Sequence, residues 1–104
     1  MIKRIQDQYN DLKKELPENV LLLFQLGDYW EAFGDDAKII AHILKIALTK
    51  RNEVPMTGIP YHMKDRSIKT LVKAGYRVAL AELTEPKNKP LENNIREISE
   101  IIND

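Results

Sequence analysis

The hydrophobic pattern of the chain is organised around one stretch near the first quarter of the sequence. Residues 21–26 form an apolar run broken only by Gln25, which predicts a buried strand. Gly27 and Asp28 follow, and both residues tolerate the positive φ angles of a two-residue hairpin turn. Residues 29–33 are rich in aromatic side chains and fit a return strand. The stretch therefore predicts a tight β-hairpin.

Alternation along the return strand separates its side chains into two sets. Tyr29 and Glu31 should point to one face and Trp30 to the other, where we expect the indole to pack in the core. Gly34, Asp35 and Asp36 then offer a helix N-cap. An aromatic ring and a carboxylate are thus expected side by side, just past a turn.

Apolar residues at helical spacing predict three helices. The first covers roughly residues 2–15 and stops before Pro17. The second runs from Asp36 to Lys45 and the third from Lys64 to Ala74, with Gly75 placed to end it. The inward-facing residues expected on the third helix are Ile68, Leu71 and Val72.

Further strands are expected between and after these helices. Residues 46–49 have a strand pattern, and residues 50–53 are polar and turn-like. Residues 54–60 should return as a strand, placed at a sheet edge because Pro55 and Pro60 cannot donate ladder hydrogen bonds. Residues 76–84 are expected to form a central strand.

The remaining segment contains a loop and an ambiguous C-terminus. Prolines and charges predict a loop over residues 85–90, and the apolar spacing of Leu91, Ile95, Ile98 and Ile102 by itself fits a helix. The alternation of helices with strands and hairpins predicts a single α/β domain over residues 1–104, with a mixed β-sheet flanked by about three helices.

Composition narrows the class of protein. The 104 residues include 16 basic and 16 acidic side chains, so a dedicated non-specific DNA binder with a basic excess is not indicated. The chain has no cysteine, and no apolar run approaches the ~20 residues of a membrane span. A soluble cytoplasmic protein without a membrane partner is favoured, and any DNA affinity should be weak and salt-sensitive.

Several motifs, in order, resemble the N-terminal mismatch-recognition domain, domain I, of the MutS DNA mismatch repair family. The first is Gly27-Asp28 followed by Tyr29-Trp30-Glu31, which matches the family's Phe-x-Glu motif after a Gly-Asp turn. The others are Asp35-Asp36-Ala37, Ala47-Leu48-Thr49-Lys50-Arg51, Pro55-Met56-Thr57-Gly58-Ile59-Pro60-Tyr61-His62 and Leu71-Val72-Lys73-Ala74-Gly75-Tyr76-Arg77-Val78-Ala79. Residues 96–102 resemble the family's last strand of this domain, so we favour a strand there.

The resemblance implies a mechanism and its residues. Family members push an aromatic wedge between bases from the minor groove, at a mismatch that is easily unstacked and bent. The resemblance assigns the wedge to Tyr29 and the base contact to Glu31. The family wedge is usually phenylalanine, and the tyrosine hydroxyl must be hydrogen-bonded or wet when inserted, so we expect weaker insertion.

Basic side chains in the expected loops and helix starts are candidates for phosphate contacts. They are Lys50, Arg51, Lys64 and Arg66, together with Lys87 and Lys89. The alternative interpretation of each of these residues is an ordinary surface charge exposed to solvent. The partners implied are double-stranded DNA with mismatches or small loops and other MutS-type or mismatch repair proteins. No cofactor or metal is expected.

Two other classes of function stay open. Asp28, Glu31, Asp35 and Asp36 form an acidic cluster in sequence that could hold Mg²⁺ for nuclease chemistry. A stand-alone interaction or regulatory module that kept the fold but lost strong DNA binding is the main alternative, favoured by the neutral charge and by Tyr29.

The sequence does not indicate an enzyme. It contains no Gly-x-x-x-x-Gly-Lys-Ser/Thr loop for ATP, whereas the resemblance implies that family members carry an ATPase in a separate region. The chain could be an excised domain or a stand-alone one.

Overall fold

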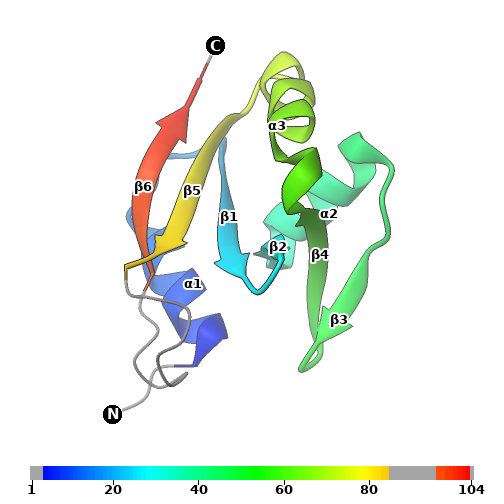
Figure 1. The fold of residues 1–104 in the computed structure, drawn as a ribbon. Helices are drawn as coiled ribbons and strands as arrows, with labels where there is room; N and C mark the ends of the chain where they lie inside the picture. Colours follow the sequence, from blue (N-terminus) through cyan, green and yellow to red (C-terminus); the bar gives the residue numbers. More distant parts are fainter. Residues whose placement is uncertain (1–3, 85–95, 104) are drawn as a thin grey trace.

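The computed structural model describes residues 4–84 and 96–103 as one mixed sheet with helices on both of its faces (Figure 1). In chain order the described elements are α1 (Ile5–Lys14), β1 (Val20–Leu26), β2 (Tyr29–Phe33), α2 (Gly34–Leu44), β3 (Thr49–Arg51), β4 (Val54–Pro60), the 3₁₀ helix η1 (Tyr61–Met63), α3 (Lys64–Lys73), β5 (Arg77–Leu83) and β6 (Arg96–Ile102). The predicted α/β class with a mixed sheet is confirmed.

The sheet has the strand order β3-β4-β2-β1-β5-β6. β1 and β5 run parallel, and every other neighbouring pair is antiparallel. The parallel pair is joined through the helices and the β2–β4 part of the sheet, since a parallel connection requires a long crossover. β5 is therefore a central strand between β1 and β6, as predicted.

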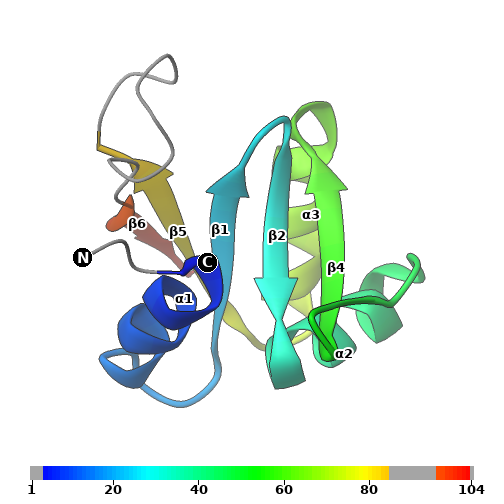
Figure 2. The same ribbon diagram turned by 90° about the horizontal axis from the view of Figure 1, so that it is seen from below.

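β1 is buried over most of its length because helices cover both of its faces. Tyr9 of α1 packs edge-on against Phe24 and Phe33, with ring centroids 5.7 Å and 5.1 Å away. α1 and α3 lie on opposite sides of the sheet (Figure 2), and α2 packs against β4 and α3. Residues 20–24 are almost inaccessible to solvent, which explains why β1 is a continuous apolar run rather than an alternating one.

The hairpin predicted at Gly27-Asp28 is confirmed. Leu26 pairs with Tyr29, so two residues form the turn, and Gly27 has a φ of +60°. A positive φ costs glycine little because it lacks a Cβ atom. Trp30 points away from Tyr29 and is buried, with 4% of its surface exposed, as alternation along the strand required.

The predicted N-cap at Gly34, Asp35 and Asp36 is wrong. α2 begins at Gly34, and its N-cap is Phe33, which makes no side-chain capping bond. All three predicted residues therefore lie inside the first turn. The carboxylate of Asp36 points instead to β1, where it accepts a hydrogen bond from the Leu22 amide at 2.9 Å.

The predicted edge position of residues 54–60 is also wrong. β4 lies between β3 and β2, and β3 is the edge strand. Pro55 is the second residue of β4 and Pro60 the last, so the prolines occupy the two ends of the strand. β3 pairs with residues 54–56 and β2 with residues 56–60, so most of β4 has a ladder on one side, which is why two prolines are tolerated in an inner strand.

The strand predicted over residues 46–49 is shifted toward the C-terminus. Only Thr49 belongs to a strand, and β3 continues through Lys50 and Arg51. The left-handed Lys45, with a φ of 58°, ends α2, and the Ile46 amide donates to the Ala41 carbonyl. The predicted turn over residues 50–53 therefore narrows to Asn52 and Glu53.

The last elements agree with the expectations where the structure describes them. α3 and β6 confirm the predicted third helix and the favoured C-terminal strand, and Gly75 has a φ of +103°. The predicted loop over residues 85–90 lies outside the described residues. Within the described part of the chain, no helix is long and apolar enough to cross a membrane.

Candidate nucleic-acid interface

Tyr29 is an exposed aromatic residue at the end of the sheet. It is the first residue of β2, directly after the turn, and 48% of its surface is accessible. It pairs with Pro60 of β4, and the Tyr61 amide donates to the Asp28 carbonyl at 3.3 Å. These contacts fix the backbone on which the ring stands, while the ring itself remains open to solvent.

Glu31 lies on the same face as Tyr29, and Gly58 of β4 lies beneath both side chains. A Cβ atom at Gly58 would stand 3.5 Å from Tyr29 Cδ1 and 3.7 Å from Glu31 Cγ. Both side chains therefore rest against the glycine, and a large side chain at this position would push them outward. The predicted pairing of ring and carboxylate on one face is present.

The carboxylate of Glu31 is more buried than the expected contact with a base implied. Its side chain is 9% exposed, and Arg51 Nη2 lies 3.6 Å from Oε1, a distance beyond hydrogen-bond range. Among the described residues, Oε1 has no hydrogen-bond partner. Burial raises the pKa of the Glu31 carboxyl above its ordinary value, and the charges of Arg51 and Arg96 oppose that rise.

Arg96 is a buried cation near this face that sequence reasoning missed. It is the first residue of β6 and is 5% exposed. Its guanidinium lies over the Phe24 ring, 4.7 Å from the ring centre, and its Nε donates to the Gln25 carbonyl. Phe24 is the cross-strand partner of Glu31. The sequence held one signal for this residue, an arginine at the start of the expected C-terminal strand. It did not specify which strand would pair with that one.

The structure does not bring the four described phosphate-contact candidates together. Arg51 faces Glu31, whereas Lys50, its neighbour in β3, points to the opposite face by strand alternation. Lys64 lies over the Trp30 ring, 5.7 Å from its centre. Arg66 is exposed on α3. Lys87 and Lys89 lie outside the described residues, so their proposed contacts stay predictions.

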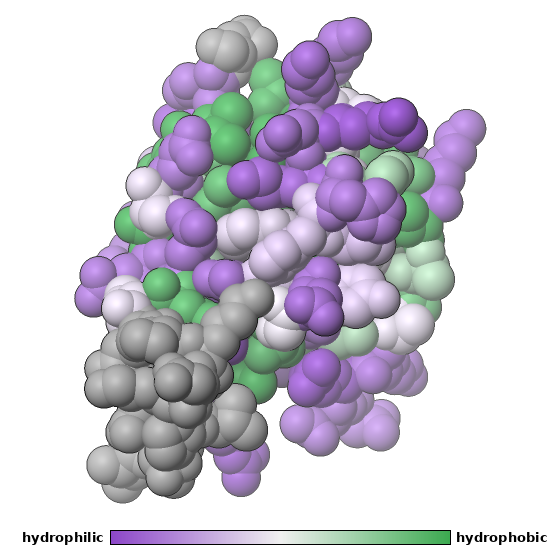
Figure 3. Space-filling view, in the orientation of Figure 1, coloured by the Kyte–Doolittle hydropathy of each residue, from purple (hydrophilic) through white to green (hydrophobic). Residues whose placement is uncertain are grey.

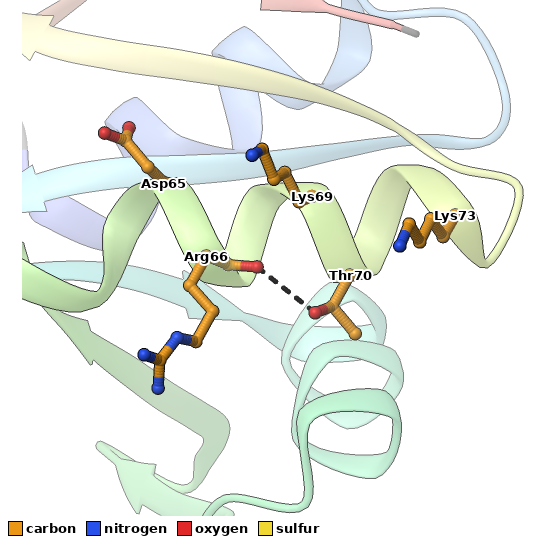
Figure 4. A pocket seen from close by; sticks show the side chains of 5 residues that line it. All are labelled: Asp65, Arg66, Lys69, Thr70 and Lys73. Atoms are coloured by element: carbon orange, nitrogen blue, oxygen red, sulfur yellow. Dashed lines mark hydrogen bonds between the residues drawn. The ribbon is translucent and has the colours of Figure 1, made fainter.

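A shallow groove of about 400 Å³ on α3 gathers basic side chains away from Tyr29. Arg66, Lys69 and Lys73 line it with Asp65 and Thr70, and the Thr70 hydroxyl donates to the Arg66 carbonyl at 3.1 Å (Figure 4). Hydrophilic side chains cover this part of the surface (Figure 3). The lining comes from one helix, which makes it a solvated basic face rather than a built site.

The acidic residues considered for Mg²⁺ are dispersed by the fold. The Asp36 carboxylate is turned inward to Tyr9, Lys13 and Leu22, whereas the Asp35 side chain is 95% exposed. Within residues 4–84 and 96–103, no group of three or more acidic or histidine side chains is arranged to hold a metal ion.

Comparisons with known proteins agree on one family. A model of the family described as MutS domain I matches residues 3–103. Curated proteins named "DNA mismatch repair protein MutS" are similar to the chain over most of its length. The one from Thermotoga maritima is 41% identical over 98 residues, covering 94% of this chain and 12% of its own. The one from Fervidobacterium nodosum is 50% identical over 84 residues, covering 81% and 10%.

A third relative, from Leptospira interrogans, is 45% identical over 96 residues, covering 91% of this chain and 11% of its own length. The chain thus spans only about a tenth of the length of these curated relatives. Because the family model covers almost the whole sequence and the fold is the expected mixed sheet, the chain belongs to the MutS domain I family.

Proposed function

We propose that this domain binds double-stranded DNA containing mismatches or small loops, with Tyr29 as the wedge and Glu31 contacting a base. The observation that carries the proposal is the exposed Tyr29 ring, next to a fixed turn and on one face with Glu31. Base stacking on an aromatic side chain contributes about 1–3 kcal/mol per base, whatever the base. Membership of the family and the names of its relatives, which are DNA mismatch repair proteins, support mismatched DNA as the target.

Glu31 suits a role in discrimination more than one in overall affinity. A carboxylate beside the ring can accept a hydrogen bond from a base edge, and it repels nearby phosphates, which disfavours ordinary duplex. Because the side chain is only 9% exposed, the contact requires the carboxylate to turn outward when the ring inserts. Lys50, Arg51, Lys64 and Arg66 are proposed to contact phosphates without reading sequence.

The main alternative is a protein-interaction or regulatory module that kept the fold without strong DNA binding. The equal numbers of acidic and basic residues favour it, because non-specific DNA affinity comes largely from basic side chains. Under this alternative the domain would capture a partner without DNA, and mismatched and paired duplex would bind alike.

Variants of Tyr29 test the wedge directly. Tyr29→Phe should preserve or tighten binding to mismatched duplex, because the hydroxyl hinders insertion and the ring face provides the stacking. Tyr29→Ala should abolish most of the preference for mismatched over paired duplex. The salt-dependent background, which basic residues provide, should remain. Titration of labelled duplexes measures both effects.

Thermal melts of the same variants separate binding from folding. Tyr29 is exposed, so both substitutions should change the free energy of unfolding by no more than about 0.5 kcal/mol. A well-folded Tyr29→Ala variant that binds mismatched and paired duplex as the unmutated chain does would rule out the wedge. The interaction-module alternative would then be favoured.

A further inference from the structure

Arg51 and Glu31 come from different strands and meet across β4. Arg51 is the last residue of the short edge strand β3, and Glu31 is the central residue of β2. Glu31 pairs with Gly58 of β4, whereas Arg51 pairs with Val54, nearer the start of the same strand. The long arginine side chain therefore reaches diagonally over β4, and Arg51 Nη2 stops 3.6 Å from Glu31 Oε1.

We infer that Arg51 is a positioning residue for Glu31: its guanidinium, reaching diagonally across β4, attracts the carboxylate and holds it turned onto the sheet face. Arg51 is well placed for this because its side chain is 42% exposed, whereas that of Glu31 is 9% exposed. A partly solvated arginine can follow the carboxylate outward. The inference rests on the proposed function only for its consequence in DNA binding.

The other groups that face Glu31 do not take over this task. Arg96 approaches from β6, but its guanidinium is already held over the Phe24 ring and by the Gln25 carbonyl. Tyr29 offers a neutral ring from the same strand, and the described β4 residue beneath the carboxylate is a glycine. Arg51 is thus the adjustable cation at this position, and Arg96 is the fixed one.

The charge of Arg51 matters to Glu31 because the Glu31 carboxyl is buried. Burial raises the pKa of the Glu31 carboxyl, and Arg51 is the larger of the two charges that lower it. Removing Arg51 leaves the burial unopposed on that side, so the pKa of Glu31 should rise. A raised pKa means that this group stabilises the folded chain in acid, and that this contribution is lost as the pH rises from the unfolded pKa through the folded one.

The first experiment measures the pKa of Glu31 by carbon-detected NMR titration, without DNA. Arg51→Gln should raise that pKa, and Arg51→Lys, which keeps a cation, should restore part of the difference. Lys50→Gln is the matched control, since it removes the same charge one residue away but on the other face. An unchanged pKa in Arg51→Gln, or an equal rise in Lys50→Gln, would overturn the inference. Amide spectra check that each variant is folded.

The second experiment is a double-mutant cycle on the ratio of affinities for mismatched and paired duplex. Arg51→Gln should lower this ratio several-fold in the unmutated background and leave it unchanged in a Glu31→Gln background. A role through phosphates alone would weaken binding to both duplexes equally in both backgrounds, and that result would count against positioning. If the unmutated chain shows no mismatch preference, the proposed function fails, whereas the titration still decides the role of Arg51.

Discussion

Asp36 links three elements through one buried carboxylate oxygen. Its Oδ2 accepts a hydrogen bond from the Leu22 amide at 2.9 Å, lies 3.2 Å from the Tyr9 hydroxyl, and lies 2.9 Å from Lys13 Nζ. The Tyr9 hydroxyl is also 2.7 Å from the Leu22 carbonyl. The pairing of β1 with β2 begins at Phe24, so the Leu22 amide has no partner in β2. The Asp36 carboxylate is the acceptor for this amide instead.

Substitution of Asp36 should destabilise the domain markedly. Asp36→Ala leaves the Leu22 amide without its partner and removes the charge opposite Lys13, so we expect a loss of about 2–3 kcal/mol in the free energy of unfolding. Asp36→Asn keeps an acceptor oxygen and should cost less. Asp35→Ala is the control, because the Asp35 side chain is 95% exposed and should matter by no more than about 0.5 kcal/mol.

Denaturant unfolding of these variants measures the free energies. Equal losses for Asp35→Ala and Asp36→Ala would contradict the role of the buried carboxylate, and would point to a shared effect on the first turn of α2.

The β3–β4 hairpin is short and carries an unfavourable turn residue. Asn52 and Glu53 form its two-residue loop between the paired residues Arg51 and Val54. Their φ angles are 50° and 68°, both in the region that two-residue hairpin loops require and that glycine tolerates best. For a glutamate, which has a Cβ atom, this conformation costs roughly 1–2 kcal/mol.

Replacement of Glu53 by glycine should therefore stabilise the hairpin. The expected gain in the free energy of unfolding is up to about 1 kcal/mol, since glycine also loses more entropy on folding. Glu53→Ala is the matched control, because it removes the carboxylate but keeps the Cβ atom, and it should give no gain. Thermal or denaturant melts compare the two. A similar gain in both variants would show that charge, and not backbone strain, was relieved.

The molecule as a whole should bind DNA weakly by itself. Its 16 basic residues are balanced by 16 acidic ones, and the described candidate cations are spread over β3 and α3 on different faces. Few phosphates can be neutralised at once, so we expect dissociation constants in the micromolar range or weaker at physiological salt. Titration of duplex at two salt concentrations tests this, and nanomolar, salt-insensitive binding would contradict it.

The local features of this fold could be predicted from the order of residues alone. Gly27-Asp28 specified a two-residue turn, and alternation after it placed Tyr29 and Glu31 together and Trp30 in the core. The inward faces of the helices followed from the spacing of apolar residues. The central position of β5 followed from its continuous apolar run. These rules act between residues that are neighbours in the chain, so no knowledge of the tertiary arrangement was needed.

Tertiary structure alone decided which distant residues meet. The two prolines of β4 suggested an edge strand, but β3 pairs outside it. β3 and β2 pair with different ends of β4, so each proline lies where the strand has a ladder on one side. Arg96 contacts Gln25 across 71 positions of sequence, and Asp36 turned from the expected helix cap to a buried strand amide. The exposed ring at Tyr29 was determined locally, whereas the burial of Glu31 and its pairing with Arg51 arise only when β2, β3 and β4 assemble.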